Sequence, residues 1–201
     1  MNADEETRLR HDVKARLRQQ ARAIRGQLPA GARAKRSNAI TDRVLALDAF
    51  SEAQAVAMFV TIRSEVDTSH LLRGAWAAGT RVALPRIDFD NDRLVLHWVD
   101  ADAELTPNRY GIPEPSASLA PVSAEKLGCI LVPGLAADDR GHRIGYGRGF
   151  YDRLLPEQPR ATRVFIGYDF QLVAEVPDTE GDEPVDWVIT DARTIRCPAR
   201  S

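Results

Sequence analysis

The stretch GCILVP, residues 128–133, is an apolar run of strand length that ends in a proline. Two similar runs, AVAMFV (55–60) and RVFIGY (163–168), also lack the regular alternation of polar and apolar residues found in a strand with one wet face. Near-continuous apolar strands occur where both faces of a parallel sheet are covered by helices. These three runs therefore predict an α/β fold.

Helical segments separate the apolar runs. Residues 4–26 are rich in Ala, Leu, Arg, Gln and Glu, and carry a thin apolar stripe formed by Leu9, Val13, Leu17 and Ile24. Further helices are predicted over 31–49, 67–78 and about 149–155, and further strands over 81–85, 93–99 and 185–190, the last of the sheet. The alternation predicts a single-domain three-layer α/β/α architecture with a central mixed, mostly parallel sheet. We treat 1–201 as one domain, with N-terminal helices over 4–49 and a sheet core over about 55–190.

Composition excludes several classes of protein. The 27 Lys and Arg residues are balanced by 29 Asp and Glu, and the net charge of −2 is not that of a dedicated nucleic-acid binder. Cys129 and Cys197 form neither a zinc motif nor a disulfide framework. The charged N-terminal segment lacks the apolar core of a secretory signal, and no apolar run approaches the length of a membrane span. We expect a cytoplasmic monomer without nucleic-acid or membrane partners.

The stretch RGHRIGYGRGFYDR, residues 140–153, follows the central apolar run and carries four glycines and four arginines. It matches neither the P-loop pattern nor the dinucleotide fingerprint. Its glycines still allow backbone N–H groups to turn around an anion, and Arg143 and Arg148 offer fork-shaped donors to phosphate oxygens. Asp152 could hold a Mg²⁺ ion that bridges phosphates. A solvated surface loop and an Arg-Gly contact to RNA are the alternatives.

Three segments become polar at the ends of predicted strands: 61–67, 133–152 and 168–171. In open α/β sheets the ligand lies at the carboxyl ends of the strands. These segments are therefore the predicted walls of one site.

The segment VPGLAADDRGHRIGYGRGFYDRLL, residues 132–155, closely resembles the signature of the 5-formyltetrahydrofolate cyclo-ligase family. Shorter matches occur in the same order along the chain and extend the resemblance from about residue 10 to 191. They are KARLR (14–18), FVTIRSEVDT (59–68), YGIPEP (110–115), IGYDFQ (166–171) and DEPVDWVIT (182–190).

The resemblance implies a single α/β domain that uses ATP and Mg²⁺ to convert 5-formyltetrahydrofolate, with or without a polyglutamate tail, to 5,10-methenyltetrahydrofolate. ATP would phosphorylate the formyl oxygen, N10 would attack the activated carbon, and ADP and phosphate would leave. No protein nucleophile is needed, because the protein has only to align the γ-phosphate with the formyl oxygen and to neutralise charge.

The resemblance also implies residue roles. Catalysis would fall to Arg148, Arg143 and Lys14. The nucleotide would contact Lys14, Ala15, Arg16, Leu17, Arg18, Arg143, Ile144, Gly145, Tyr146, Gly147, Arg148, Gly149, Phe150 and Tyr151. The folate would contact Arg18, Val60, Glu65, Tyr110, Tyr146, Gly147, Arg148, Gly149 and Phe150. The metal would be held by Asp152 and Asp186.

Several of these roles have simpler alternatives on residue type alone. Lys14 and Arg18 could be solvated charges on a basic helix, Glu65 a surface acid, Tyr110 a loop aromatic that plugs the core, and Asp186 an ordinary acid at a strand start. The chain also departs from the family pattern. Position 148 is Arg where many members have Lys, position 150 is Phe where many have Tyr, and the segment 177–184 lacks a histidine that is frequent there. A non-catalytic homologue, or an ATP-using enzyme with another N-acyl or pterin-like substrate, would share parts of the pattern.

Overall fold

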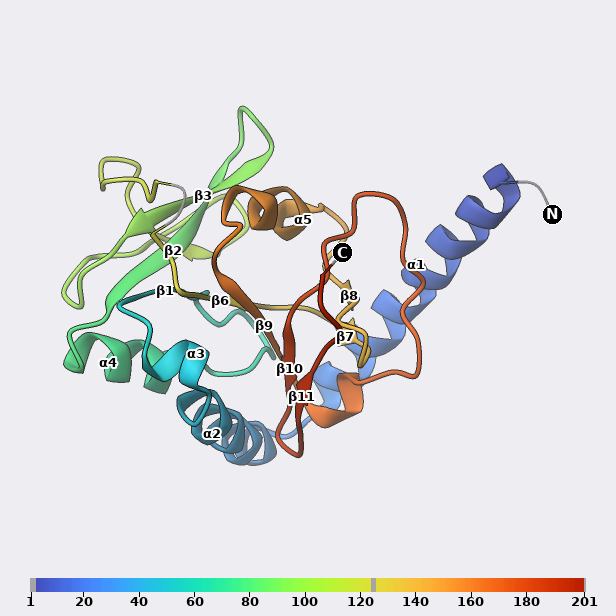
Figure 1. The fold of residues 1–201 in the computed structure, drawn as a ribbon, viewed down its shortest axis with the longest axis horizontal. Helices are drawn as coiled ribbons and strands as arrows, with labels where there is room; N and C mark the ends of the chain where they lie inside the picture. The colour runs from blue at the N-terminus through green and yellow to red at the C-terminus, as the bar shows by residue number, and fades with distance from the viewer. Residues whose placement is uncertain (1–2, 124–125, 201) are drawn as a thin grey trace.

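The computed structural model describes residues 3–123 and 126–200. Within these residues a seven-stranded sheet has the order β11-β10-β9-β6-β1-β2-β3 (Figure 1). Its strands are β1 (Ala55–Ala57), β2 (Arg81–Asp88), β3 (Arg93–Trp98), β6 (Cys129–Val132), β9 (Thr162–Ile166), β10 (Trp187–Ile189) and β11 (Thr194–Arg196). The five inner strands are parallel, and the two edge strands, β3 and β11, are antiparallel to their neighbours. The predicted mixed, mostly parallel sheet is confirmed; the extent of the single domain stays a prediction.

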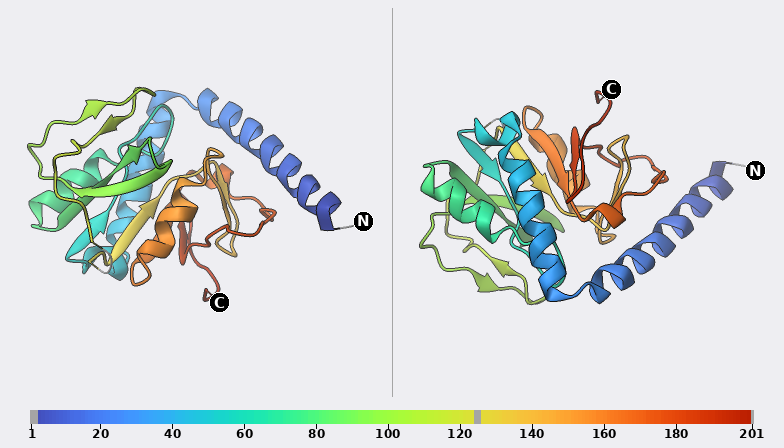
Figure 2. Two further views of the ribbon diagram at one scale, coloured as in Figure 1. Left: turned by 90° about the horizontal axis from the view of Figure 1, so that it is seen from above. Right: turned by 90° about the horizontal axis from the view of Figure 1, so that it is seen from below.

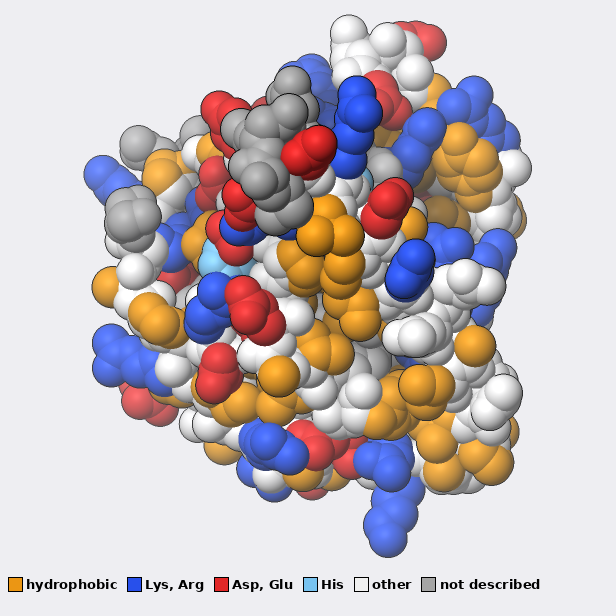
Figure 3. Space-filling model, turned by 90° about the vertical axis from the view of Figure 1, so that its right-hand side faces the viewer, with side chains coloured by type: hydrophobic (Ala, Val, Ile, Leu, Met, Phe, Trp, Pro, Cys, Tyr) orange, Lys and Arg blue, Asp and Glu red, His pale blue; other side chains and the backbone are white. Residues whose placement is uncertain are grey.

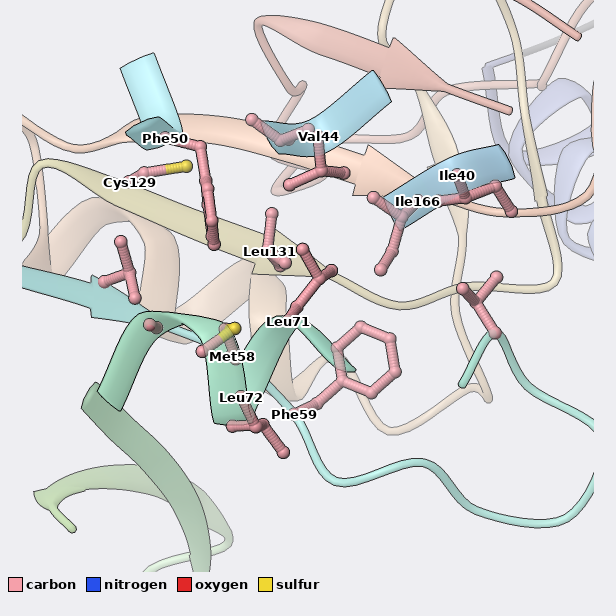
Figure 4. Close-up of a cluster of buried hydrophobic side chains, with 14 of the residues drawn as sticks. Ile40, Val44, Phe50, Met58, Phe59, Leu71, Leu72, Cys129, Leu131 and Ile166 are labelled. Atoms are coloured by element: carbon pink, nitrogen blue, oxygen red, sulfur yellow. The ribbon is translucent and has the colours of Figure 1, made fainter. Parts of the chain in front are cut away.

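Successive residues of the central strands face opposite layers, as the pleat of a strand requires. Cys129 and Leu131 of β6 join one core cluster, whereas Ile130 and Val132 join the other. The first cluster is covered by α2 (Ala30–Leu45), α3 (Asp48–Ser51) and α4 (Ser69–Ala77), whose apolar side chains meet those of the strands in Figure 4. The second is covered by α5 (Phe150–Leu154) and the short 3₁₀ helix η1 (Leu155–Glu157). Burial on both faces explains the unbroken apolar runs.

The first helix, α1 (Ala3–Gln27), does not cover the sheet. Its N-terminal part projects from the body of the molecule (Figure 2), and Leu9 and Ile24 are 52% and 53% exposed. Leu17 packs on a small cluster around the hairpin of β7 (Ala136–Ala137) and β8 (Arg143–Ile144). The predicted apolar stripe of this helix is therefore only partly correct.

Other predicted boundaries were wrong for physical reasons. The strand predicted to stop at Pro85 continues to Asp88. Strand β1 pairs with β2 only as far as Ala83, so on that side no strand requires a hydrogen bond from residue 85, and a proline is tolerated there. The helix predicted over 31–49 breaks after Leu45, where the chain turns Leu47 into the core. The strand predicted as the last is followed by β11.

Some short elements lie in segments predicted only as loop. They are the β7–β8 hairpin, a second hairpin of β4 (Thr106–Pro107) and β5 (Pro113–Glu114), and the 3₁₀ helix η2 (Asp169–Gln171). The β7–β8 hairpin matters for function, because it positions the start of the glycine-rich loop against α1.

Candidate active site

The C-terminal half of α1 lies along the glycine-rich loop with one basic face. Four residues of this face are spaced three or four apart, so they share one side of the helix. They are Lys14, Arg18, Arg22 and Arg25. Arg18 Nε donates to the carbonyl oxygen of Gly145 at 3.1 Å, and Arg22 Nη2 donates to that of Tyr146 at 3.3 Å. The structure thus brings Arg18, Arg22 and Arg25 to the loop, while the predicted nucleotide contacts of Lys14 and Arg18 stay predictions.

Lys14 is buried at one end of this face, where it forms an ion pair with Asp182 and donates to Thr179 Oγ1 at 2.7 Å. Burial raises the pKa of Asp182, but hydrogen bonds from Lys14 and Thr179 outweigh it and hold the pKa below its ordinary value. Lys14 is therefore not a solvated surface charge. Its neighbours Ala15 and Arg16, predicted to contact nucleotide, are exposed.

Arg143 lies in β8 and is 6% exposed. Its Nη1 donates to Asp152 Oδ1 at 2.8 Å, whereas Nε and Nη2 are buried without a hydrogen-bond partner among the described residues. A buried donor without a partner costs roughly 1–3 kcal/mol. Arg143 therefore leaves two buried nitrogens without an acceptor at the start of the loop.

The loop itself needs glycine at two turns. Gly147 has φ +100° and Gly149 has φ +62°, in the left-handed region where other residues are strained. Arg148 between them is half-exposed and has Asp92 at 3.4 Å as its partner, a weak surface pair. Helix α5 begins directly afterwards, with Phe150 and Tyr151 half-buried in its first turn. Burial raises the pKa of Tyr151.

Glu65 lies in the loop after β1 and is almost fully buried. The Tyr146 hydroxyl donates to Glu65 Oε1, the backbone N–H of Ile62 donates to Oε2 at 3.2 Å, and Arg25 Nη2 donates to the Tyr146 oxygen at 2.5 Å. Burial raises the pKa of Glu65, and the bond from Tyr146 only partly opposes this effect. Glu65 is thus a buried acceptor rather than a surface acid.

Arg25 connects the predicted walls to α1. Its Nε donates to Ser64 Oγ at 3.2 Å and its Nη1 to the Gly134 carbonyl at 3.2 Å. From the third wall, Gln171 Nε2 also donates to the Gly134 carbonyl, at 3.0 Å, and the Tyr168 hydroxyl donates to the Glu65 carbonyl at 3.0 Å. The segments after β1, β6 and β9 therefore meet at one place, as their positions at strand ends predicted.

The two predicted folate contacts Val60 and Tyr110 differ in burial. Val60 lies three residues after the end of β1 and is half-buried against the first core cluster. Tyr110 is 51% exposed on the β4–β5 hairpin, where its ring meets the edge of Phe89 at 5.6 Å and Arg109 at 5.3 Å. It does not plug the core, and its ring contacts are with Phe89 of the β2–β3 turn and with its neighbour Arg109 rather than with Glu65.

Asp152 and Asp186, the two predicted metal ligands, have different hydrogen-bond partners, and their role in metal binding stays a prediction. Asp152 Oδ1 accepts from Arg143 and from the backbone N–H of Glu183 at 3.2 Å. Asp186 accepts from the Arg163 N–H at 2.8 Å and from Arg200 Nε at 2.8 Å, at the starting ends of β9 and β10. Asp182 precedes Glu183 in the chain, and its own carboxylate is paired with Lys14 and Thr179.

Sequence reasoning missed the role of Asp138, whose side chain is fully buried. Its carboxylate accepts from the backbone N–H groups of Arg140, His142 and Val176 and from the Arg140 side chain at 2.9 Å. It closes the β7–β8 hairpin and anchors the segment after η2. The turn sequence Asp-Asp-Arg-Gly (138–141) was the available signal, because Asp bonds to N–H groups two residues on.

Charges on the surface are mixed. On the face drawn in Figure 3, lysine and arginine side chains alternate with aspartate and glutamate. Among the described residues, no helix is long and apolar enough to span a membrane.

Comparison with known proteins agrees with this geometry. The model of the 5-formyltetrahydrofolate cyclo-ligase family matches residues 10–191. The 5-formyltetrahydrofolate cyclo-ligase of Escherichia coli K12 is 35% identical over 145 residues, which are 70% of this chain and 80% of that protein. The mouse protein of the same name is 24% identical over 188 residues, 88% of this chain and 91% of that protein.

Two solved structures share the fold. The NMR structure of Aquifex aeolicus 5,10-methenyltetrahydrofolate synthetase has a TM-score of 0.82 and 30% identity, and the match covers 94% of this chain and 95% of that one. A Mycoplasma pneumoniae 5,10-methenyltetrahydrofolate synthetase has a TM-score of 0.72 at 20% identity, over 89% and 98%, and supports the fold alone. With the family model matched over residues 10–191, the chain belongs to the 5-formyltetrahydrofolate cyclo-ligase family.

Proposed function

We propose that this protein converts 5-formyltetrahydrofolate to 5,10-methenyltetrahydrofolate in an ATP-dependent cyclisation, as a ring-forming C–N ligase. One observation carries the proposal: the basic face of α1 and the glycine-rich loop meet the buried Glu65 at the carboxyl ends of the inner strands. Donors for phosphate and an acceptor for a pterin thus lie on two sides of one loop.

The nucleotide end of the site is formed by Lys14, Arg18 and Arg143. The two unpartnered donors of Arg143 fit phosphate oxygens, which accept bidentate hydrogen bonds from a guanidinium. Arg18 lies close to Gly147: a Cβ atom added at this glycine would be 3.7 Å from Arg18 Nε. Arg148 would leave its weak pair with Asp92 to contact the transferred phosphoryl group.

The carboxylates fit Mg²⁺ only together with phosphates. Among residues 3–123 and 126–200, no group of three acidic, histidine or cysteine side chains could hold a metal ion alone. Mg²⁺ usually combines one or two carboxylates with substrate phosphates and water. We propose Asp152 and Asp182 as its ligands, with Asp186 as the alternative, because Asp182 pairs with Lys14 and the next residue, Glu183, donates its backbone N–H to Asp152. When bound, the ion would neutralise charge between the phosphates.

The folate end is formed by Glu65, Val60 and Tyr146. The N–H groups of a pterin ring are donors, and a buried carboxylate is their natural acceptor. The Tyr146 hydroxyl now bonds to Glu65 Oε1 and would yield this oxygen to the pterin. Tyr110 would come to the folate from the β4–β5 hairpin.

The chemistry proposed asks the protein for alignment and charge neutralisation rather than for a nucleophile. ATP phosphorylates the formyl oxygen of 5-formyltetrahydrofolate and becomes ADP. N10 then attacks the activated carbon, and the oxygen leaves with the phosphate. Lys14, Arg143 and Arg148 stabilise the negative charge that moves during transfer, which is where donors fixed in advance contribute most.

Two further features belong to the same proposal. Both cysteines, Cys129 and Cys197, are buried and free, which suits a reducing compartment such as the cytoplasm. We propose that the protein works there as a monomer, on folate with or without a polyglutamate tail.

The decisive experiment mixes purified protein with 5-formyltetrahydrofolate, ATP and Mg²⁺ and follows the absorbance of the methenyl product. The proposal requires product formation that depends on both ATP and Mg²⁺. A folded protein that forms no product under any of these conditions would exclude the activity. Omission of ATP and of Mg²⁺ in turn provides the controls.

A further inference from the structure

Tyr168 lies in the turn between β9 and η2, and its side chain is fully buried. Its hydroxyl donates to the backbone carbonyl of Glu65 at 3.0 Å. Burial raises the pKa of Tyr168, so the hydroxyl keeps the proton that it donates. Glu65 is therefore held through its backbone as well as through its carboxylate.

Ser37 extends this contact into α2. Its hydroxyl lies 3.5 Å from that of Tyr168, a long hydrogen bond, and accepts from the backbone N–H of Asp67 at 3.0 Å. Because Tyr168 gives its one hydroxyl proton to Glu65, Ser37 must be the donor between the two hydroxyls. Three hydrogen bonds thus run in one direction, from the Asp67 N–H to the Glu65 carbonyl.

The position of Tyr168 is itself fixed. Its backbone N–H donates to Gln171 Oε1 at 2.9 Å. Gln171 Nε2 in turn donates to the carbonyls of Gly134 and Leu135, both at 3.0 Å. The Tyr168 ring stacks on that of Phe170, with 5.6 Å between the centroids. Tyr168 is therefore a rigid support at the carboxyl end of β9.

Glu65 depends on support of this kind because of the segment that carries it. Residues 61–68 form neither a helix nor a strand, so no regular ladder of hydrogen bonds fixes them. Thr61 and Thr68 bond to one another and close the base of the segment. Glu65 lies in its middle, where contacts from other elements can set the direction of the carboxylate.

Two hydrogen bonds reach Glu65 from outside this segment, among the residues that the structure describes. Tyr146 donates to the carboxylate and Tyr168 to the backbone carbonyl. Tyr146 would yield its place on the carboxylate to a pterin, whereas the bond from Tyr168 involves an atom that the pterin does not need. Tyr168 is thus the contact that holds Glu65 both with and without ligand.

We propose that Tyr168 is a positioning residue for folate binding, whose hydroxyl fixes the backbone of Glu65 so that the carboxylate meets the pterin without reorganisation. The inference rests on the proposed function, because it takes a pterin as the partner of Glu65. An acceptor that is ordered before binding loses less entropy when the ligand arrives, so the hydroxyl adds affinity without touching the ligand. Ser37 adds less, since its contact with Tyr168 is long.

The test combines calorimetric binding of 5-formyltetrahydrofolate with steady-state kinetics. Tyr168→Phe removes only the hydroxyl and should weaken folate binding about fivefold to tenfold, the effect of one hydrogen bond. The KM for ATP should not change. Ser37→Ala should give a smaller loss of the same kind. In a Glu65→Gln background, Tyr168→Phe should weaken folate binding by at most about twofold, because the carboxylate through which it acts is absent.

Thr41→Val is the matched control. Thr41 lies one turn after Ser37 on α2, and its buried hydroxyl has no hydrogen-bond partner among the described residues. Removal of this hydroxyl should leave folate binding at the wild-type value. A loss as large as that of Tyr168→Phe would overturn the proposal, because any buried hydroxyl near this face of the sheet would then have the same effect.

Two further results would overturn it. One is a lower melting temperature of Tyr168→Phe with unchanged folate affinity, since the hydroxyl would then serve stability alone. The other is an equally large loss of affinity in the Glu65→Gln background. Ser37→Ala supplies the same comparisons if Tyr168→Phe does not fold. A wild-type protein that binds no 5-formyltetrahydrofolate would instead refute the proposed function.

Discussion

Arg143 and Arg163 are both buried arginines, 6% and 4% exposed, and they differ in how their donors are satisfied. Arg163 donates to the Glu183 carboxylate at 2.7 Å and to the Leu155 carbonyl at 3.0 Å, and only its Nε lacks a partner. Arg143 donates to Asp152 alone, and two of its three nitrogens lack a partner. The two side chains share type and burial, and only one of them is prepared for a ligand.

The difference shows where this fold tolerates buried donors without hydrogen-bond partners. Unpaired buried donors destabilise a protein, so they persist where a ligand supplies the missing acceptor. The Arg163 cluster ties the starting ends of β9 and β10 together, whereas the Arg143 cluster faces the glycine-rich loop. We therefore infer that Arg163 serves the fold and Arg143 serves the reaction.

The largest effect is expected for Arg143→Ala. Loss of the donors should lower kcat/KM for ATP by about 10²–10³-fold, the usual cost of removing a donor that stabilises transferred charge. The melting temperature should fall less than when Arg163 is replaced, because removal of two unpaired buried donors offsets part of the lost bond to Asp152. Steady-state kinetics and thermal melts measure both, and Arg143→Lys, which keeps the charge without the fork, should lie between. A large loss of stability with normal turnover would reverse the comparison.

Arg163→Ala should give the opposite pattern. Its removal leaves Glu183 and the Leu155 carbonyl without their partner, and breaking a buried pair costs about 3 kcal/mol. In a chain of this size the melting temperature should fall by roughly 6–12 °C. Turnover per folded molecule, measured well below the melting temperature, should stay close to wild type. A selective rise in KM for ATP would show that Arg163 also belongs to the site.

The sequence predicted the sheet well because its strands are buried on both faces, and the apolar runs at 55–60, 128–133 and 163–168 have no other simple explanation. It predicted β11 poorly because Thr194–Arg196 contains a single apolar residue, too few to show a period. The structure brings Arg18 and Glu65, two residues that the family resemblance singled out, to the glycine-rich loop, and pairs a third, Lys14, with Asp182.

The remaining site residues depend on tertiary contacts that leave no local pattern. Arg25 appears in sequence as one of many charges on a basic helix, and only the packing of α1 on the loop gives it three partners. Asp182 and Asp186 are both acids in one polar segment, so spacing alone could not tell that Asp182 pairs with Lys14 whereas Asp186 pairs with Arg200.

Asp182 and Asp186 offer a second test of which polar residues serve the site and which serve the fold. Asp182→Asn should raise the Mg²⁺ concentration needed for half-maximal rate by about tenfold or more, a loss typical of one weakened ionic contact. Asp186→Asn should leave this requirement unchanged and lower stability instead, because Asp186 pairs with Arg200 and the Arg163 N–H. Mg²⁺ titrations at saturating ATP, with Asp152→Asn as the reference for a site carboxylate, measure the difference. A Mg²⁺ defect confined to Asp186→Asn would restore the pairing predicted from sequence.

The smallest effect concerns Glu65, the other charge at the site whose burial is not fully compensated. Burial raises its pKa above the ordinary 4.5, so the folded protein keeps this proton to a higher pH than the unfolded chain does. Ionised Glu65 therefore lowers stability as pH rises through the raised pKa, and this effect disappears below about 4.5. Glu65→Gln keeps an acceptor for Tyr146 without the charge. It should raise the melting temperature at pH 8 by about 2–4 °C, the shift produced by about 1 kcal/mol, and by less at pH 5. The same variant should bind 5-formyltetrahydrofolate more weakly in calorimetry. A stabilisation that does not depend on pH would show that packing, rather than the buried charge, limits stability at this end of the molecule.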